Sequence, residues 1–225
     1  MAAADRARAR GRVKKAIAGY RKALESDPSD PAVNVKLAPL LARVGDRDGS
    51  ARCFRTAANK HLEAGFTDRA AAVNLAATGV FPLDPGFRME LARLNVMRGR
   101  KQDALATLIE GARAIRKARR PDAAAALLKR AVAVEPWHLE ASLLLVPLLW
   151  KSGGVDAARQ LLGGLESRNR GGALRRVRWV AFRMSPSPAS FWRFLRTSAG
   201  ARAAPAAAPA ERPAPRQASS ARTRR

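Results

Sequence analysis

The sequence repeats itself with a 54-residue period. When residues 31–82 are laid over residues 85–136, the same residue type recurs at many positions. Examples are Leu37 and Leu91, Ala38 and Ala92, Gly45 and Gly99, Asp68 and Asp122, and Pro82 and Pro136. A fixed period of this kind indicates an array of stacked units, each of which buries its apolar face only against its neighbours. Such an array favours a binding surface over a catalytic pocket.

The repeated segments have the pattern of helices. Apolar residues recur three and four positions apart, and no run alternates as a strand would. Asp30 and Asp84 each precede a proline, a combination typical of a helix start. The expected helices cover residues 2–10, 12–26, 31–44, 46–64, 66–80, 86–98, 100–118, 121–134, 138–152 and 154–166. We therefore predict an all-α chain up to about residue 166.

The turns between these helices alternate in spacing. They fall at Gly11, Gly45, Gly65, Gly99, Arg119 and Gly153, so that a longer interval, as from 11 to 45, alternates with a shorter one, as from 45 to 65. This alternation predicts a super-repeat of three helices per period, with long unbroken helices over 46–64 and 100–118.

The residues around the first turn resemble the tetratricopeptide repeat (TPR) family. The spacing of Gly11, Ala16, Tyr20, Ala23 and Pro28 is similar to the second half of a TPR unit. The resemblance continues through three later units and covers roughly residues 5–166. It implies a TPR-like solenoid of helical hairpins that binds proteins or peptides. The sequence departs from the family because a TPR unit has two helices, whereas each period here has three. Regular stacking of three-helix units would swap inner and outer faces between copies.

The C-terminal quarter differs from the repeats in charge. The chain has a formal net charge of +25. Residues 1–166 carry 29 basic and 17 acidic side chains, whereas residues 167–225 carry 14 and 1. Segments 171–184 and 187–197 are expected to form two short helices, and residues 198–225 have no apolar side chain larger than alanine or proline. We predict a helical repeat domain (1–166), a basic aromatic helical cap (167–197) and a disordered basic tail (198–225).

No residue pattern indicates catalysis, a metal or a cofactor. His61 and His138 are the only histidines, and Cys53 is the only cysteine. We expect His61 and Cys53 to have packing roles, and we predict that the protein is not an enzyme. The first fifteen residues lack an apolar stretch, so we expect no secretory signal. The longest apolar run, residues 143–150, is far shorter than the ~20 residues that span a bilayer. With a single cysteine, these features favour the cytoplasm.

The TPR resemblance implies a candidate groove, because the first helices of TPR units line a concave surface. The positions carried over are Val35, Arg43, Met89, Arg93, Val96, Leu143 and Trp150. Their largely apolar character suits a helix or an apolar peptide. The alternative interpretation is that they are ordinary core residues.

A second candidate site combines arginines with aromatic residues. It consists of Arg175, Arg176, Arg178, Trp179 and Arg183, on the side of a helix opposite to its apolar face. Exposed aromatic rings between arginines suit base stacking and phosphate contact, or an interfacial membrane helix. The alternative is that this segment closes the end of the solenoid.

The first functional expectation is a protein-interaction module or scaffold with a protein or peptide partner. The alternative is a basic nucleic-acid-associated protein that contacts phosphates through residues 168–225. Association with an anionic membrane surface is the third expectation.

Overall fold

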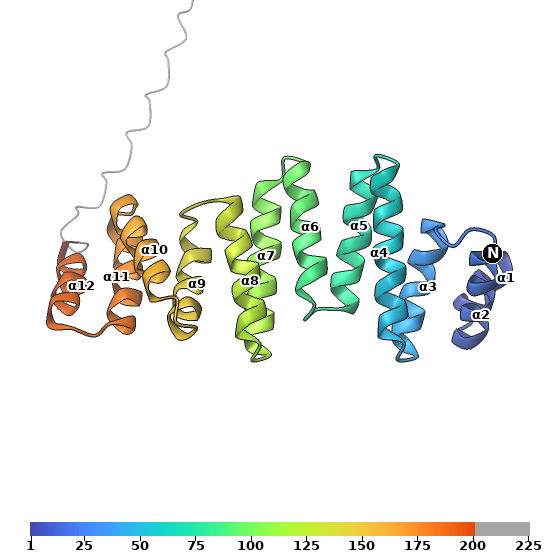
Figure 1. The fold of residues 1–225 in the computed structure, drawn as a ribbon, viewed down its shortest axis with the longest axis horizontal. Coiled ribbons are helices and arrows are strands. Elements are labelled where there is room, and N and C mark those ends of the chain that lie inside the picture. Colours follow the sequence, from blue (N-terminus) through green and yellow to red (C-terminus); the bar gives the residue numbers. More distant parts are fainter. Residues whose placement is uncertain (201–225) are drawn as a thin grey trace, which may run out of the picture.

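The computed structural model describes residues 1–200, which form twelve α-helices arranged in one row along the long axis (Figure 1). The helices are α1 (Ala2–Ala9), α2 (Val13–Leu24), α3 (Pro31–Arg43), α4 (Arg47–Glu63), α5 (Thr67–Val80), α6 (Pro85–Met97), α7 (Lys101–Lys117), α8 (Pro121–Val134), α9 (Leu139–Lys151), α10 (Val155–Arg168), α11 (Gly171–Met184) and α12 (Pro188–Gly200). The described residues contain no strand. The predicted all-α solenoid is confirmed, and α4 and α7 are the two long unbroken helices, with 17 residues each.

The C-terminal boundary differs from the prediction. In the structure α12 extends to Gly200, five residues beyond Leu195, the last large apolar residue. The helix thus runs three residues past residue 197, the predicted end of the cap. The rest of the predicted disordered tail lies outside the described residues.

Six short turns end their helices in the same way. The residue after each C-cap has a positive φ, at Gly11 (68°), Gly45 (90°), Gly65 (77°), Gly99 (74°), Arg119 (60°) and Gly153 (87°). In each turn the next N–H reaches back to a carbonyl in the last turn of the helix, as from Asp46 to Leu41 (3.0 Å) and from Arg120 to Ile115 (3.2 Å). This is the Schellman arrangement, which satisfies the last helical carbonyls. The predicted turn positions are confirmed.

A longer connection precedes the first helix of each unit, and its last residue caps that helix. Asp30 accepts hydrogen bonds from the N–H groups of Ala32 and Val33, and Asp84 accepts one from Gly86. Pro31 and Pro85 occupy the first turn, where the missing N–H costs nothing. His138 has the equivalent place before α9 and accepts from Ala141 N–H.

The packing within each three-helix unit explains how the chain avoids swapping its inner and outer faces from one unit to the next. In each unit the first helix contacts the third: α3 with α5, α6 with α8, and α9 with α11. The second helix, α4, α7 or α10, packs against both members of its pair. Within the described residues, α4, α7 and α10 make no substantial contact with one another. One layer thus receives two helices per unit, and the other layer receives one.

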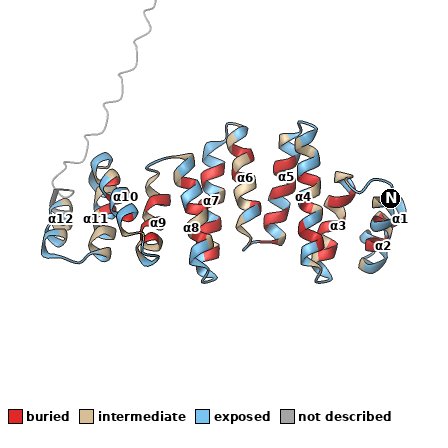
Figure 2. Cartoon of the chain, viewed as in Figure 1, coloured by how far each residue is buried: buried red, intermediate tan, exposed pale blue. Residues whose placement is uncertain are grey.

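Small side chains let these helices approach closely. Ala16, Ala70 and Ala124 are separated by one period each, and all three are fully buried. Buried residues form stripes along the helix contacts (Figure 2). The largest apolar cluster runs from α6 to α11, and a second contains Phe54, Phe81 and Phe87. Each unit therefore depends on its neighbours for its core.

Candidate docking surfaces

Five of the seven candidate groove residues occupy equivalent places in successive units. Val35, Met89 and Leu143 are separated by one period each and lie on α3, α6 and α9, and Val96 and Trp150 form a second matched pair. All five side chains are half-buried. Val35 packs against the phenylalanine cluster, and the other four pack against the largest cluster. These side chains are therefore partly core and partly surface.

The two arginines of the candidate groove differ in their surroundings. Arg43 is exposed at the end of α3. On α6, Arg93 Nε donates to Glu90 Oε2 at 3.0 Å, and this contact raises the pKa of Arg93. Its Nη1 also lies 3.4 Å from the sulfur of Met97. The positive charge of Arg93 is therefore compensated, whereas that of Arg43 faces solvent.

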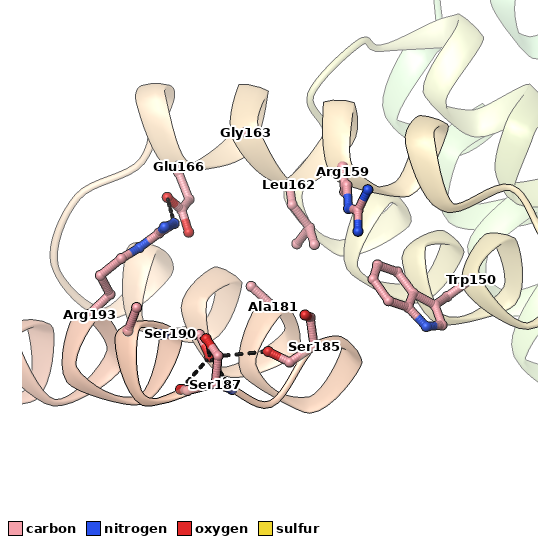
Figure 3. Close-up of a pocket in the computed structure, with 11 residues that line it drawn as sticks. Trp150, Arg159, Leu162, Gly163, Glu166, Ala181, Ser185, Ser187, Ser190 and Arg193 are labelled. Atoms are coloured by element: carbon pink, nitrogen blue, oxygen red, sulfur yellow. Dashed lines mark hydrogen bonds and ion pairs between the residues drawn. The ribbon is translucent and has the colours of Figure 1, made fainter.

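The structure also places Trp150 at a cleft that the sequence did not reveal (Figure 3). This end cleft has a volume of about 360 Å³ and lies between α10 and the start of α12. Apolar side chains, including Leu162 and Ala181, line it beside Trp150. No sequence motif could have revealed it, because its residues come from four helices.

Charged and hydroxyl groups complete the end cleft. Arg193 Nη2 donates to Glu166 Oε2 at 3.5 Å across one side, and Arg159 lies over Trp150 at 5.8 Å on the other (Figure 3). The Ser187 hydroxyl accepts from Ser190 N–H at the start of α12 (3.1 Å). Both charge signs and an aromatic ring therefore face one opening, which suits an amphipathic protein segment.

One face of α11 packs on the solenoid. Val177 is fully buried in the largest cluster, and Val180, Ala181 and Met184 pack against it. This is the apolar face expected from the sequence, and α11 contacts both α9 and α10.

The opposite face of α11 is partly covered by α12. The Trp179 ring lies 5.2 Å from that of Phe194, and the Phe182 ring lies 5.7 Å from that of Phe191. Arg178 Nη1 donates to the backbone carbonyl of Arg193 at 2.9 Å. Two of the five candidate anion contacts, Arg178 and Trp179, thus help to hold α12 in place, although Trp179 stays 45% exposed.

The other three candidate anion contacts face solvent. Arg175, Arg176 and Arg183 are exposed on α11. Trp192 on α12 is 61% exposed. The sequence missed Trp192 as an exposed ring, because only the packing of α12 on α11 decides which aromatic rings face outward.

The two side chains considered for catalysis or metal binding, Cys53 and His61, are half-buried. Cys53 is half-buried against two core clusters, and burial raises the pKa of its thiol. His61 is half-buried, and burial, with help from Arg69, lowers its pKa. Across residues 1–200, no group of His, Cys, Asp or Glu side chains is arranged to hold a metal. No helix in that part of the chain combines the length and the apolar character that crossing a membrane requires.

The fold and these surfaces define a helical-repeat protein. Two family models described as tetratricopeptide repeat match the chain, over residues 55–116 and 116–177. The matches together cover more than half of the sequence, and the chain belongs to the tetratricopeptide repeat family. TPR arrays are generally protein–protein interaction modules and are typically non-enzymatic scaffolds.

Several solved structures are similar to parts of the chain. A MamA protein shares 16% identity over 74% of this chain and 88% of its own, with a TM-score of 0.25. Pseudomonas aeruginosa pilF shares 15% identity over 88% and 85%, with a TM-score of 0.30. A human IFIT1 dimer with m7Gppp-AAAA shares 15% identity over 82% of this chain but only 45% of its own, with a TM-score of 0.32. These scores carry no functional argument. No curated protein matches the sequence.

Proposed function

We propose that this protein is a non-enzymatic scaffold that binds a segment of a partner protein along α3, α6 and α9. The observation that carries the proposal is the repetition of half-buried apolar side chains at equivalent positions, Val35, Met89 and Leu143. A partner that lies along the array meets the same apolar contact in each unit, and apolar contact is what seats an amphipathic helix in a groove. We further propose a cytoplasmic location, because a sequence with a single cysteine is typical of a reducing compartment.

Affinity capture with and without nuclease tests this proposal. We expect protein partners that resist nuclease treatment and that are lost when Met89 is changed to Ser. Leu75→Ser provides a matched control, because Leu75 is 61% exposed on α5 and lies outside the groove positions. Partners that all disappear after nuclease treatment would contradict the proposal.

The second candidate function is nucleic-acid binding by the C-terminal helices. Within residues 167–200 there is no carboxylate side chain, while exposed arginines and the exposed rings of Trp179 and Trp192 lie on α11 and α12. If Arg175 and Arg183 contact phosphates, changing both to Ala should reduce the logarithmic salt slope of binding by about 0.7–0.9 per lost contact. Arg178→Ala should instead loosen α12, because Arg178 donates to a backbone carbonyl of that helix. An unchanged slope in the Arg175→Ala, Arg183→Ala variant would rule out both arginines as phosphate contacts. Anionic membrane remains the third candidate partner for the same basic surface, and vesicle sedimentation would test it.

A further inference from the structure

Three clefts recur along the solenoid beside the second helices of the units. One lies between α4 and the start of α6 (about 490 Å³), one between α7 and the start of α9 (about 230 Å³), and the third is the end cleft beside α10. We call the first two the α4 cleft and the α7 cleft.

The α4 and α7 clefts are the same feature in successive units. Their lining residues include four pairs that are one period apart: Asp48 and Gln102, Ala51 and Leu105, Arg55 and Ile109, and Asp84 and His138. The fold explains the repetition. One layer has a single helix per unit, so α4, α7 and α10 are not in substantial contact, and clefts remain beside them.

The α4 cleft carries a net positive charge, because three arginines (Arg47, Arg55 and Arg120) and two aspartates (Asp48 and Asp84) line it. Arg55 pairs with Asp84 at 3.8 Å. Arg47 lies over the Phe81 ring at 4.9 Å, and Arg120 Nη1 donates to the carbonyl of Leu83 at 3.0 Å. Among the described residues, no carboxylate lies within ion-pair distance of Arg47 or Arg120. Two guanidinium groups are therefore available to a carboxylate of a ligand.

The α7 cleft has a different lining at the same positions. The buried side chains of Leu105 and Ile109 form its apolar part. Arg113 pairs with Glu140 at its rim, and Glu110 adds a second carboxylate. These carboxylates would repel a phosphate backbone, whereas a polypeptide with an apolar side chain fits this lining.

We propose that the α4 and α7 clefts receive one acidic and apolar segment of a partner polypeptide. Carboxylate side chains of the segment lie between Arg47 and Arg120, and an apolar side chain contacts Ala106 beside the buried Leu105 and Ile109. The net charge of +25 favours encounter with an acidic partner. Helices pack ~8–10 Å apart, so two helices of one layer separate the clefts by roughly 16–20 Å. An extended chain, at ~3.3 Å per residue, covers that distance with about six residues. This inference rests on the proposed function in that the partner is a protein.

The test uses a fluorescent synthetic peptide with two glutamates, a spacer of five glycines and serines, and two leucines. Fluorescence anisotropy is measured with the full chain. The Arg47→Gln, Arg120→Gln variant should bind this peptide about tenfold more weakly, since two charge-assisted contacts are lost. The Lys129→Gln, Arg130→Gln variant loses the same charge at exposed positions on α8 and should bind as the wild type does. A peptide with lysine in place of glutamate should not bind to the cleft.

Several results would overturn the proposal. They are the absence of saturable binding, an equal loss in both variants, and a selective loss of binding to a single-stranded oligonucleotide instead of the peptide.

Circular dichroism checks the fold of each variant. If the loss of the Arg120 hydrogen bond unfolds the protein, the single variant Arg47→Gln tests the proposal by its peptide affinity. The guanidinium group of Arg47 lies over the Phe81 ring. If affinity capture retains a nuclease-resistant partner with unchanged affinity in the Arg47→Gln, Arg120→Gln variant, the scaffold function stands and the cleft proposal is wrong.

Discussion

Arg119 adopts the left-handed backbone conformation that Gly65 adopts one period earlier, with φ values of 60° and 77°. Both residues follow the long second helix of a unit, and both donate their N–H to a carbonyl three residues back, at 3.0 and 2.9 Å. The turn geometry is therefore fixed by the architecture of the unit, even where a side chain makes it costly. For residues other than glycine this conformation costs roughly 1–2 kcal/mol.

Arg119→Gly should stabilise the protein. Glycine removes the steric cost of the positive φ but adds entropy to the unfolded chain, so we expect a net gain of about 0.5–1 kcal/mol in the free energy of unfolding. Urea unfolding followed by circular dichroism measures it. Gly65→Ala is the converse variant and should destabilise by a similar amount. A loss of stability in Arg119→Gly would mean that the arginine side chain contributes more than its backbone costs.

Two adjacent glycines in α10 should respond in opposite directions to alanine. A Cβ on Gly164 would overlap the ring of Trp137, whereas a Cβ on Gly163 meets no atom within 4 Å. We expect Gly164→Ala to destabilise by about 1–3 kcal/mol through overpacking. Gly163→Ala should stabilise by up to about 1 kcal/mol through helix propensity. Equal effects in thermal unfolding would show that Trp137 does not pack against α10 in this way.

The phenylalanine cluster should dominate the stability of the α3–α5 and α6–α8 units. Phe54 is 2% exposed, and its ring lies 6.3 Å from that of Phe81 and 6.2 Å from that of Phe87. Phe54→Ala should cost about 3–5 kcal/mol. Phe66→Ala removes a ring that is 50% exposed and should cost much less. Chemical denaturation of the two variants compares them directly, and similar losses would contradict the burial pattern.

Stability in acid should depend on Asp5. Tyr20 OH donates to Asp5 Oδ1 at 2.7 Å, and Lys36 Nζ donates to the same oxygen at 2.9 Å. These contacts lower the pKa of Asp5 in the folded state. The folded chain therefore favours the carboxylate, and this contribution is present above the ordinary carboxyl pKa and is lost as the pH falls through the lowered value.

Asp5→Asn should make unfolding less dependent on pH in the acid range. Urea midpoints between pH 6 and pH 3 measure the effect. Asp122→Asn, at an exposed position on α8, serves as the control. If the two variants show the same acid dependence as the wild type, the Asp5 contacts do not stabilise the fold.

Helices and turns were predictable because their signals are local. Asp30 followed by Pro31 specifies a capped helix start, and Gly45 specifies a C-terminal turn. Arg119 was predicted only by its place in the repeat period, since its residue type gives no turn signal. The period thus carries information that single residues lack.

The layer arrangement and the clefts could not be predicted. Contact between α3 and α5 depends on how the turns at the two ends of α4 direct these helices, and no residue pattern specifies that direction. Arg47 and Arg120 are far apart in sequence and come together only through this packing. The orientation of α12 depends similarly on ring contacts such as that between Trp179 and Phe194.

Photo-crosslinking tests the scaffold function most directly. Benzoylphenylalanine placed at Arg93 on α6 probes the candidate groove, and the same residue placed at Leu75 on α5 probes an exposed position outside it. Cross-linking is performed in cell extract, followed by nuclease treatment and electrophoresis. The scaffold function predicts a nuclease-resistant protein adduct at position 93 and none at position 75. Adducts that disappear with nuclease, or that form equally at both positions, would contradict it.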